Sequence, residues 1–375
     1  MGIVQRIVVR HDHSGQSLIR LVSIASLRHP LQSNFGALRS CLIIDQQMLS
    51  HYLSTVGPSL SMAPTFLIVG ATGNTGVGVV ETLSQDLKNN STWPNVRILA
   101  QTRSKDSSTA QKLVKLPGVE LVEKPWIEIT SDWLREHEVV RVFIASHNLP
   151  NHFAEESTFL LEARNADVEY VVRISTTAAN VRPDSPAYYP RQHWAIEAML
   201  GTPEFEKLHW SSLQPNVFYA YYINTAADLI KKFRKDGKQD TLRLMASEDG
   251  PVGVIDGREV GVFAAKLLLE KDTTKHNQAK YVLNGPEDLS GKQIVDLVEG
   301  YIGQKVENVS YKDLSFLEYM AAQSNESRDV IMSIRHAPVT GWDGKCTAST
   351  TSKEVLEIAA PKVTPAQALK AMLEE

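Results

Sequence analysis

The chain has 375 residues, of which 43% are hydrophobic and 22% are charged, and its formal net charge is −4. This composition excludes a wholly disordered or fibrous protein, and the length allows one large or two small domains. The net charge does not suggest nucleic acid as the main partner, because phosphate binding needs clustered positive charge. Two cysteines, Cys41 and Cys346, are too few for a disulfide framework or a cysteine-built metal site. They fit a reducing compartment, so we expect a cytoplasmic protein.

Residues 1–61 differ from the rest of the chain. They contain five arginines, no lysine, two acidic residues and ten serines. Such a segment is typical of an organelle transit peptide, but a non-essential extension has the same appearance. Met62 stands just before the first apolar run and looks like the start of the compact protein. We therefore expect residues 1–61 to be an extension, disordered or a leader, that lies outside the fold.

Short apolar runs alternate with helical patterns from residue 65 onward. Thr65–Val69 is continuously apolar, which is typical of a strand buried on both faces in a parallel sheet. Strands that alternate with helices predict a doubly wound parallel sheet over residues 62–220. Further strands are predicted at 95–100, 119–122, 139–145, 168–175 and 210–214.

Three glycines follow the first predicted strand and open a helix. Gly70 allows the tight turn, Gly73 lets the backbone approach a pyrophosphate, and Gly76 allows close packing of the helix on the sheet. The phosphates then lie against free N–H groups at the positive end of the helix dipole. No Gly-Lys-Ser/Thr follows, so the motif predicts a dinucleotide rather than a nucleoside triphosphate.

The end of the second predicted strand selects the dinucleotide. A carboxylate at this point binds the ribose hydroxyls of NAD, whereas an arginine accommodates the 2′-phosphate of NADP. Here Arg103 and Lys105 stand near the strand tip, which carries no acid. The planar guanidinium suits a phosphate because it donates two parallel hydrogen bonds. We therefore expect NADP(H), held through Arg103.

The alternation of strands and helices loosens beyond residue 220. We read residues 221–375 as mainly a smaller mixed α/β lobe that closes over the cofactor and holds the substrate. The chain is expected to re-enter the core near 252–285. Helices are predicted around 221–235, 257–271, 290–302 and 312–322, and short strands near 241–246 and 280–283.

Several segments together resemble the NmrA-like group of the atypical short-chain dehydrogenase/reductases. The resemblance covers roughly residues 65–305. It implies a Rossmann core, an NADP-type cofactor and a substrate pocket under the C-terminal lobe. The segments that carry it are the glycine loop 70–76, the strand end 171–175, the helix start 189–197, the turn 213–218 and the segment 255–260.

The resemblance also implies which residues bind the cofactor. They are Gly70, Thr72, Gly73, Asn74, Thr75, Gly76, Arg103, Ser146, Pro215 and Asn216. His147 and Asn148 are further candidate contacts at the end of the fourth strand. The aromatic stretch 218–222 suits either a flat conjugated substrate or packing between the lobes. Near Trp126, the aspartate with which relatives often contact adenine is missing.

The catalytic residues depend on the helix predicted after the fifth strand. The main branch of the superfamily places a Tyr there with a Lys four residues later on the same helix face. Here Tyr189 has His193 in the Lys position, and a histidine can itself exchange a proton near neutral pH. Pro190 predicts that Tyr189 lies just outside the helix body, and Tyr188 is an equal alternative. Ser175 ends the fifth strand, where its hydroxyl polarises a substrate carbonyl or satisfies the backbone.

Two functions follow from these expectations. The first is an NADP(H)-dependent oxidoreductase that reduces a small conjugated carbonyl, enone or quinone, with Tyr189, His193 or Ser175 polarising the substrate oxygen. Family members of this kind include oxidoreductases of fungal secondary metabolism. The second is a non-catalytic NADP sensor that acts through a protein partner, because the Tyr–Lys pair is lost. No metal-binding motif is present in the sequence, and no membrane partner is expected.

Overall fold

The computed structural model describes residues 5–11, 17–23 and 63–374. The chain divides into two compact units, residues 1–60 and 61–375. In the first unit, β1 (Gln5–His11) pairs antiparallel with β2 (Ser17–Ser23). The remaining residues of the predicted extension lie outside the described part, so its disorder or role as a leader stays a prediction.

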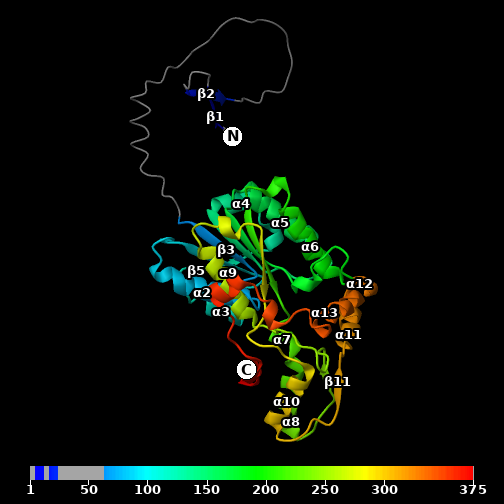
Figure 1. Cartoon of the computed structure of the whole chain (residues 1–375). Helices are drawn as coiled ribbons and strands as arrows, with labels where there is room; N and C mark the ends of the chain where they lie inside the picture. Colours follow the sequence, from blue (N-terminus) through cyan, green and yellow to red (C-terminus); the bar gives the residue numbers. More distant parts are fainter. Residues whose placement is uncertain (1–4, 12–16, 24–62, 375) are drawn as a thin grey trace, which may run out of the picture. The chain divides into compact units, whose positions relative to one another are not determined.

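Seven parallel strands form the main sheet of the second unit (Figure 1). The chain runs from β3 at the centre through β4 to β5 at one edge, then returns to the centre and continues through β6, β7 and β8 to β10 at the other edge. This order confirms the doubly wound parallel sheet, and its reversal between β3 and β6 places a ligand crevice at their carboxyl ends. The strands are β3 (Thr65–Val69), β4 (Arg97–Thr102), β5 (Val119–Glu123), β6 (Val139–Ile144), β7 (Tyr170–Ile174), β8 (His209–Pro215) and β10 (Ala279–Leu283).

Helices cover both faces of this sheet, which explains why the central strand β3 is almost continuously apolar. Phe66 and Ile68 belong to the core under α2 and α9, whereas Leu67 and Val69 belong to the core under α5 and α6. Successive side chains of a strand point to opposite faces, so a strand buried on both sides has no polar face. The covering helices are α2 (Gly76–Asp86), α3 (Ser108–Leu113) and α9 (Gly257–Leu269) on the first face, and α4 (Ser131–Glu136), α5 (His152–Asn165) and α6 (Tyr188–Leu200) on the second.

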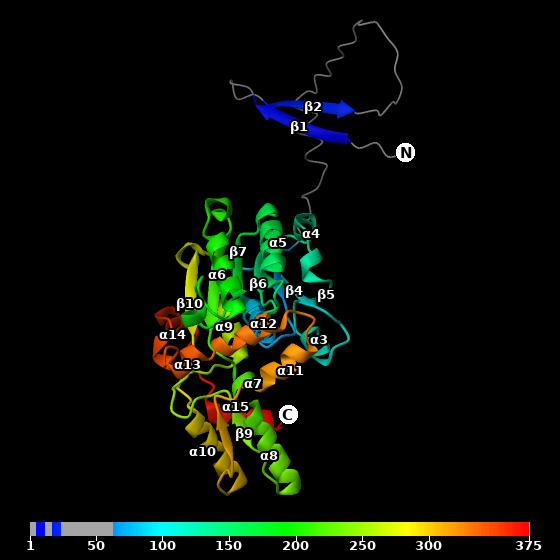
Figure 2. The same cartoon turned by 90° about the vertical axis from the view of Figure 1, so that its right-hand side faces the viewer.

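A smaller lobe with its own hydrophobic core gathers at one end of the sheet (Figure 2). Its helices surround a parallel pair of short strands, β9 (Leu242–Leu244) and β11 (Val309–Tyr311). Between its segments the chain returns to the main sheet through α9 and β10. The other helices of this part of the chain are α7 (Tyr219–Tyr222), α8 (Asn224–Asp236), α10 (Gly291–Ile302), α11 (Phe316–Gln323), α12 (Arg328–Met332), α13 (Val339–Trp342), α14 (Lys353–Ala359) and α15 (Pro365–Glu374).

Two glycines allow α2 and α9 to approach each other closely. A Cβ atom at Gly78 of α2 would lie 2.3 Å from the carbonyl oxygen of Arg258, and one at Gly261 of α9 would lie 2.3 Å from the carbonyl oxygen of Thr75. Neither position has room for a side chain. Because Thr75 ends the glycine loop, the packing of α9 also fixes the position of that loop.

We expect Gly261→Ala to lower the free energy of unfolding by about 1–3 kcal/mol, because the new methyl group forces α9 away from α2. Chemical denaturation measures this change. Gly300→Ala is the matched control, since Gly300 is exposed in α10 and a Cβ there would meet nothing within 4 Å. That substitution should stabilise the protein by about 0.5–1 kcal/mol. Equal effects at the two positions would contradict the proposed close contact.

Candidate functional site

A cavity of about 710 Å³ opens at the carboxyl ends of the parallel strands, where the strand order reverses. The loops after six of the strands, the first turns of α6 and the helix α7 form its walls. All the predicted site residues line it except Gly76, which is buried under the glycine loop. Those in the walls are Gly70, Thr72, Gly73, Asn74, Thr75, Arg103, Ser146, Ser175, Tyr189, His193, Pro215 and Asn216.

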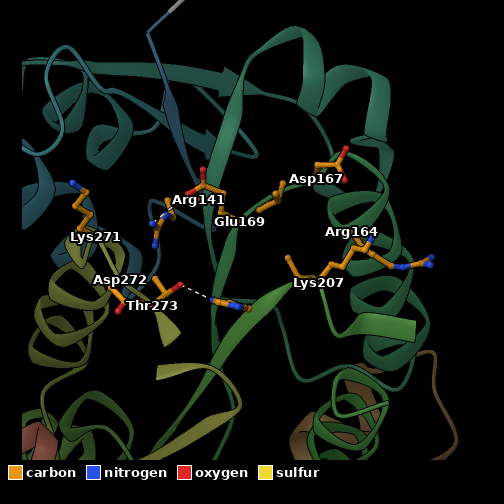
Figure 3. A pocket seen from close by; sticks show the side chains of 11 residues that line it. Arg141, Arg164, Asp167, Glu169, Lys207, Lys271, Asp272 and Thr273 are labelled. Carbon is orange, nitrogen blue, oxygen red and sulfur yellow. Dashed lines mark hydrogen bonds and ion pairs between the residues drawn. The ribbon is translucent and has the colours of Figure 1, made fainter. Parts of the chain in front are cut away.

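A second cavity, of about 380 Å³, lies at the opposite edge of the sheet, where the strands begin. Figure 3 shows Arg164 and Lys271 extending outward on its two sides. Arg141 is buried, with Nη2 3.3 Å from the Glu169 carboxylate and its guanidinium over the Trp93 ring. Because these charged groups do not converge on one point, the first cavity is the candidate site.

The glycine loop is held in place from two neighbouring strands. Gly70 has a φ of +75°, and a Cβ atom on it would lie 2.6 Å from the Ala145 carbonyl oxygen, so only glycine fits. The Gly70 N–H donates to Gln101 Oε1 at 3.0 Å, and Gln101 Nε2 donates to the Lys124 carbonyl at 2.7 Å. A Cβ atom at Gly76 would lie 2.1 Å from the Gly70 carbonyl oxygen. Our sequence reasoning missed Gln101, although a polar residue in an apolar strand was the available signal.

The side of the cavity next to β4 and β5 carries a cation and an aromatic ring. Arg103 is exposed there and forms no ion pair with any residue that the structure describes. Trp126, which follows β5, also lines the cavity. Lys105 does not line it, and its backbone N–H donates to Glu123 Oε2 at 2.7 Å. The pair of Arg103 and Trp126 suits a phosphorylated adenosine.

Helix α6 begins at Tyr188, so the prediction that Tyr189 lies outside the helix is wrong. Pro190 fits the first turn because the first N–H groups of a helix have no partner inside it. Tyr189 and His193 therefore share a helix face, and both line the cavity. Tyr188 is buried and donates its hydroxyl to the Asn148 carbonyl at 2.5 Å. Of these two neighbouring tyrosines, Tyr189 is therefore the one that lines the cavity.

Both ring nitrogens of His193 are engaged. Arg173 Nη2 donates to Nδ1 at 2.9 Å, so Nε2 carries the proton and donates to Asn148 Oδ1 at 3.0 Å. Burial lowers the pKa of His193 well below its ordinary value of 6.5, and the neighbouring Arg173 and His152 lower it further. The ring is therefore a neutral hydrogen-bond donor. The expectation that it exchanges a proton near neutral pH does not fit this environment.

Two other predicted residues at the end of β6 also use their polar atoms within the protein. The Leu149 N–H donates to His147 Nδ1 at 3.2 Å, and His147 Nε2 lies 2.7 Å from Glu155 Oε2. Ser146 Oγ donates to Glu156 Oε2 at 2.9 Å. These contacts hold the wall of the cavity in place.

In the predicted turn after β8, one polar side chain bonds within the protein, and two aromatic side chains line the cavity. Asn216 Nδ2 donates to Asn284 Oδ1 at 3.0 Å and to the Cys346 carbonyl at 2.8 Å, so both of its amide hydrogens are used. Of the aromatic stretch, Phe218 and Tyr221 line the cavity, and their stacked rings have centroids 6.3 Å apart. The remaining tyrosines, Tyr219 and Tyr222, are buried in the core of the smaller lobe.

Ser175 and Tyr189 line the cavity, and their hydroxyl groups are the candidates for contact with a bound molecule. Ser175 is 4% exposed, and its Oγ has no hydrogen-bond partner in the described part of the chain. Such a group costs about 1–3 kcal/mol when it is unpaired, so a ligand atom is expected to contact it. Burial raises the pKa of Tyr189, although a hydrogen bond to Thr176 opposes this. The Tyr189 phenol is therefore protonated at neutral pH and can donate.

A network of buried charges lies behind His193. Arg173 is fully buried, and its Nε donates to Glu156 Oε1 at 2.5 Å while its Nη1 donates to Ser212 Oγ at 3.0 Å. Burial alone would raise the pKa of Glu156, but Arg173 and His152 hold it well below its ordinary value of 4.5. Our sequence reasoning did not identify this network, although Arg173 is a charged residue in an otherwise apolar strand.

Neither a metal site nor a membrane helix is found among residues 5–11, 17–23 and 63–374. No group of three His, Cys, Asp or Glu side chains there is placed to hold a metal ion. No helix within these ranges is long and apolar enough to cross a bilayer.

Comparisons with known proteins point to one family. The model of the NmrA-like family matches residues 62–327. An uncharacterized oxidoreductase of Bacillus subtilis, YesF, is 28% identical over 152 residues, which are 40% of this chain and 46% of that protein, so the match spans less than half of it. An NAD(P)H azoreductase of Xenophilus azovorans is 23% identical over 244 residues, 65% of this chain and 76% of that protein.

A solved structure has the same fold. An NADPH-dependent quinone oxidoreductase from Escherichia coli, in complex with NADPH, superposes with a TM-score of 0.61 at 18% sequence identity. The match covers 82% of this chain and 99% of that one. It supports the Rossmann-type arrangement of the sheet and helices.

We expect Glu156→Gln to lower the free energy of unfolding at pH 7 by up to about 3–5 kcal/mol, because Arg173 loses the nearer of its two buried counter-charges, the other being Glu197 Oε1, 3.7 Å from Nη1. The pKa of Glu156 is lower in the folded than in the unfolded state, so its contribution is present above pH 4.5 and is lost as the pH falls below that value. The difference between wild type and variant, measured by urea denaturation, should therefore shrink in acid.

Glu169→Gln is the control for this prediction. Its carboxylate also pairs with a buried arginine, Arg141, but is 55% exposed. A pair screened by water in this way contributes about 1 kcal/mol or less. If Glu156→Gln lowered the free energy of unfolding by no more than Glu169→Gln, or by an amount that did not change with pH, the buried network would not stabilise the protein as we expect.

Proposed function

The chain belongs to the NmrA-like family, and from its cavity we propose that it is an NADP(H)-dependent oxidoreductase that reduces a small conjugated carbonyl, enone or quinone. One observation carries the proposal. A single cavity joins the glycine loop and the unpaired Arg103 to the hydroxyls of Ser175 and Tyr189. Relatives named an NAD(P)H azoreductase and an NADPH-dependent quinone oxidoreductase support it.

The residues present fit a dinucleotide. A Cβ atom added at Gly73 would meet only the Gly70 carbonyl oxygen, at 3.3 Å, so the space beside this backbone is open to a diphosphate. The N-terminus of α2 directs its positive dipole end toward the same place. Arg103 would hold the 2′-phosphate, and Trp126 would face the adenine. The unpaired Ser175 hydroxyl would gain its partner from the bound molecules.

The chain's own residues supply binding and polarisation, whereas a bound nicotinamide supplies the hydride. Ser175 and Tyr189 donate hydrogen bonds to the substrate oxygen, where negative charge develops as the carbonyl is reduced. The neutral Tyr189 phenol can also deliver a proton to that oxygen. Phe218 and Tyr221 present ring faces that suit a flat conjugated substrate.

A cofactor sensor without turnover is the second candidate. It is favoured by His193, which replaces the Lys of the Tyr–Lys pair and has no free ring nitrogen. Stopped-flow absorbance at the NADPH band, with a panel of quinones, enones and azo dyes, separates the two functions. Turnover of any of these substrates supports the oxidoreductase. Tight NADPH binding without turnover of any of them favours the sensor.

We expect Arg103→Ala to raise the dissociation constant for NADPH about 10- to 100-fold, because one charge-assisted contact to the 2′-phosphate is lost. The dissociation constant for NADH should not change, since NADH lacks that phosphate. Isothermal titration calorimetry measures both. Lys105→Ala removes a cation from the same loop but outside the cavity, and it should leave both constants unchanged. Equal losses of NADPH and NADH affinity in Arg103→Ala would count against this assignment.

We expect Tyr189→Phe to lower kcat about 100-fold and Ser175→Ala about tenfold, while the affinity for NADPH stays the same. Each variant removes a donor to the substrate oxygen without altering the cofactor contacts. Tyr188→Phe is the matched control, because its hydroxyl is bound to the Asn148 carbonyl. It should lose about 0.5–1.5 kcal/mol of stability and keep its kcat. A loss of kcat in Tyr188→Phe as large as in Tyr189→Phe would overturn the choice between the two tyrosines.

A further inference from the structure

Arg173 is a buried cation that does not line the cavity itself but contacts His193, which does. It lies on β7 and does not line the cavity, whereas His193 on α6 does. Its guanidinium joins the Glu156 carboxylate, at 2.5 Å, to His193 Nδ1, at 2.9 Å. His193 in turn donates from Nε2 to Asn148 Oδ1, at 3.0 Å, on the loop after β6. A continuous chain of contacts therefore runs from a buried carboxylate to the wall of the cavity.

We propose that Arg173 is a positioning residue, which fixes His193 as the neutral Nε2–H tautomer and thereby holds Asn148 and the adjoining wall of the cavity in place. The effect on turnover rests on the function proposed above. The tautomer does not, because it depends only on contacts within this chain.

The chemistry of arginine determines which ring nitrogen of His193 carries the proton. A guanidinium donates hydrogen bonds and accepts none, so the ring nitrogen that faces it must be unprotonated. With the proton on Nδ1, two donors would face each other at Arg173, and Asn148 Oδ1 would lose its donor. The first fault would lie between Arg173 and His193, which are 0% and 2% exposed, where an unpaired polar group is most costly.

The charged groups around His193 also oppose its protonation. Arg173 faces it from β7, while His152 and Glu156 face it from α5, with the two histidine rings 4.7 Å apart between centroids. Glu156 is the one acid of this group, and its oxygens already accept from Arg173, His152 and Ser146. The imidazole therefore gains little from becoming a cation.

The tautomer can be measured directly by ¹⁵N NMR of the histidine rings in the wild-type protein. We expect His193 to show the neutral Nε2–H pattern, unchanged between about pH 5 and 8, where an ordinary histidine titrates. A neutral Nδ1–H pattern, or titration in this range, would overturn the proposal. No variant has to fold for this measurement.

The test of positioning uses the double variant Glu156→Gln with Arg173→Met, which removes both members of this buried ion pair, while the buried Glu197 keeps Lys280 Nζ as its partner at 3.0 Å. The Nδ1–H tautomer should appear, and kcat should fall about tenfold with unchanged NADPH affinity. Arg141→Met is the matched control, because Arg141 is also a buried strand arginine but lies at the other cavity. It should keep the wild-type tautomer and kcat.

The outcomes separate this proposal from the proposed function. A double variant that retains the pure Nε2–H tautomer, or that changes tautomer with no change in kcat, overturns the positioning role. Wild-type protein with the expected tautomer but no turnover of any substrate supports the action of Arg173 on His193, and it is the proposed reductase function that then fails.

Discussion

The left-handed backbone at Gly70 is the constraint on which the cavity depends. At this point β3 ends beside β6, and a side chain would collide with the Ala145 carbonyl oxygen. Because the chain turns without a side chain, its N–H can reach Gln101 on β4. The turn, the neighbouring strand and the start of α2 thus form one rigid unit. The same close approach recurs where α9 packs on α2, so the segment that returns from the smaller lobe supports the loop from behind.

Buried charged residues lie behind the part of the cavity wall that contains His193. Arg173, Glu156 and Glu197 all lie on elements of the main sheet domain with almost no exposure to water. Glu197 accepts from Ser212 Oγ at 2.7 Å and lies 3.0 Å from Lys280 Nζ, although we had no sequence signal for its burial. Such ions are weak evidence for stability, since apolar residues often replace them without loss. In our proposal, Arg173 and Glu156 instead fix the orientation of His193 and of the wall beside it.

Local signals made most of the fold predictable from the sequence. The apolar runs located each strand of the sheet within a few residues, because a strand buried on both faces has no polar side to obscure the pattern. The glycine loop and Arg103 could be proposed as cofactor contacts for the same reason, since the expectation for each rests on residues next to it in the chain. The start of α6 was misjudged because Pro190 was expected to begin the first turn, whereas it is the third residue of the helix, a position that also tolerates proline.

The state of His193 was beyond such reasoning because its partners are distant in the sequence. Arg173 reaches it from a strand 20 residues earlier, and Asn148 from a loop 45 residues earlier. Together they turn a residue that ordinarily titrates near neutral pH into a fixed donor. This bears on how a reductase can work without the Tyr–Lys pair. Hydride transfer to a conjugated carbonyl needs a polarised oxygen, and preorganised neutral hydroxyls can supply that polarisation without an ammonium group. The absence of the lysine therefore does not require that catalysis be lost.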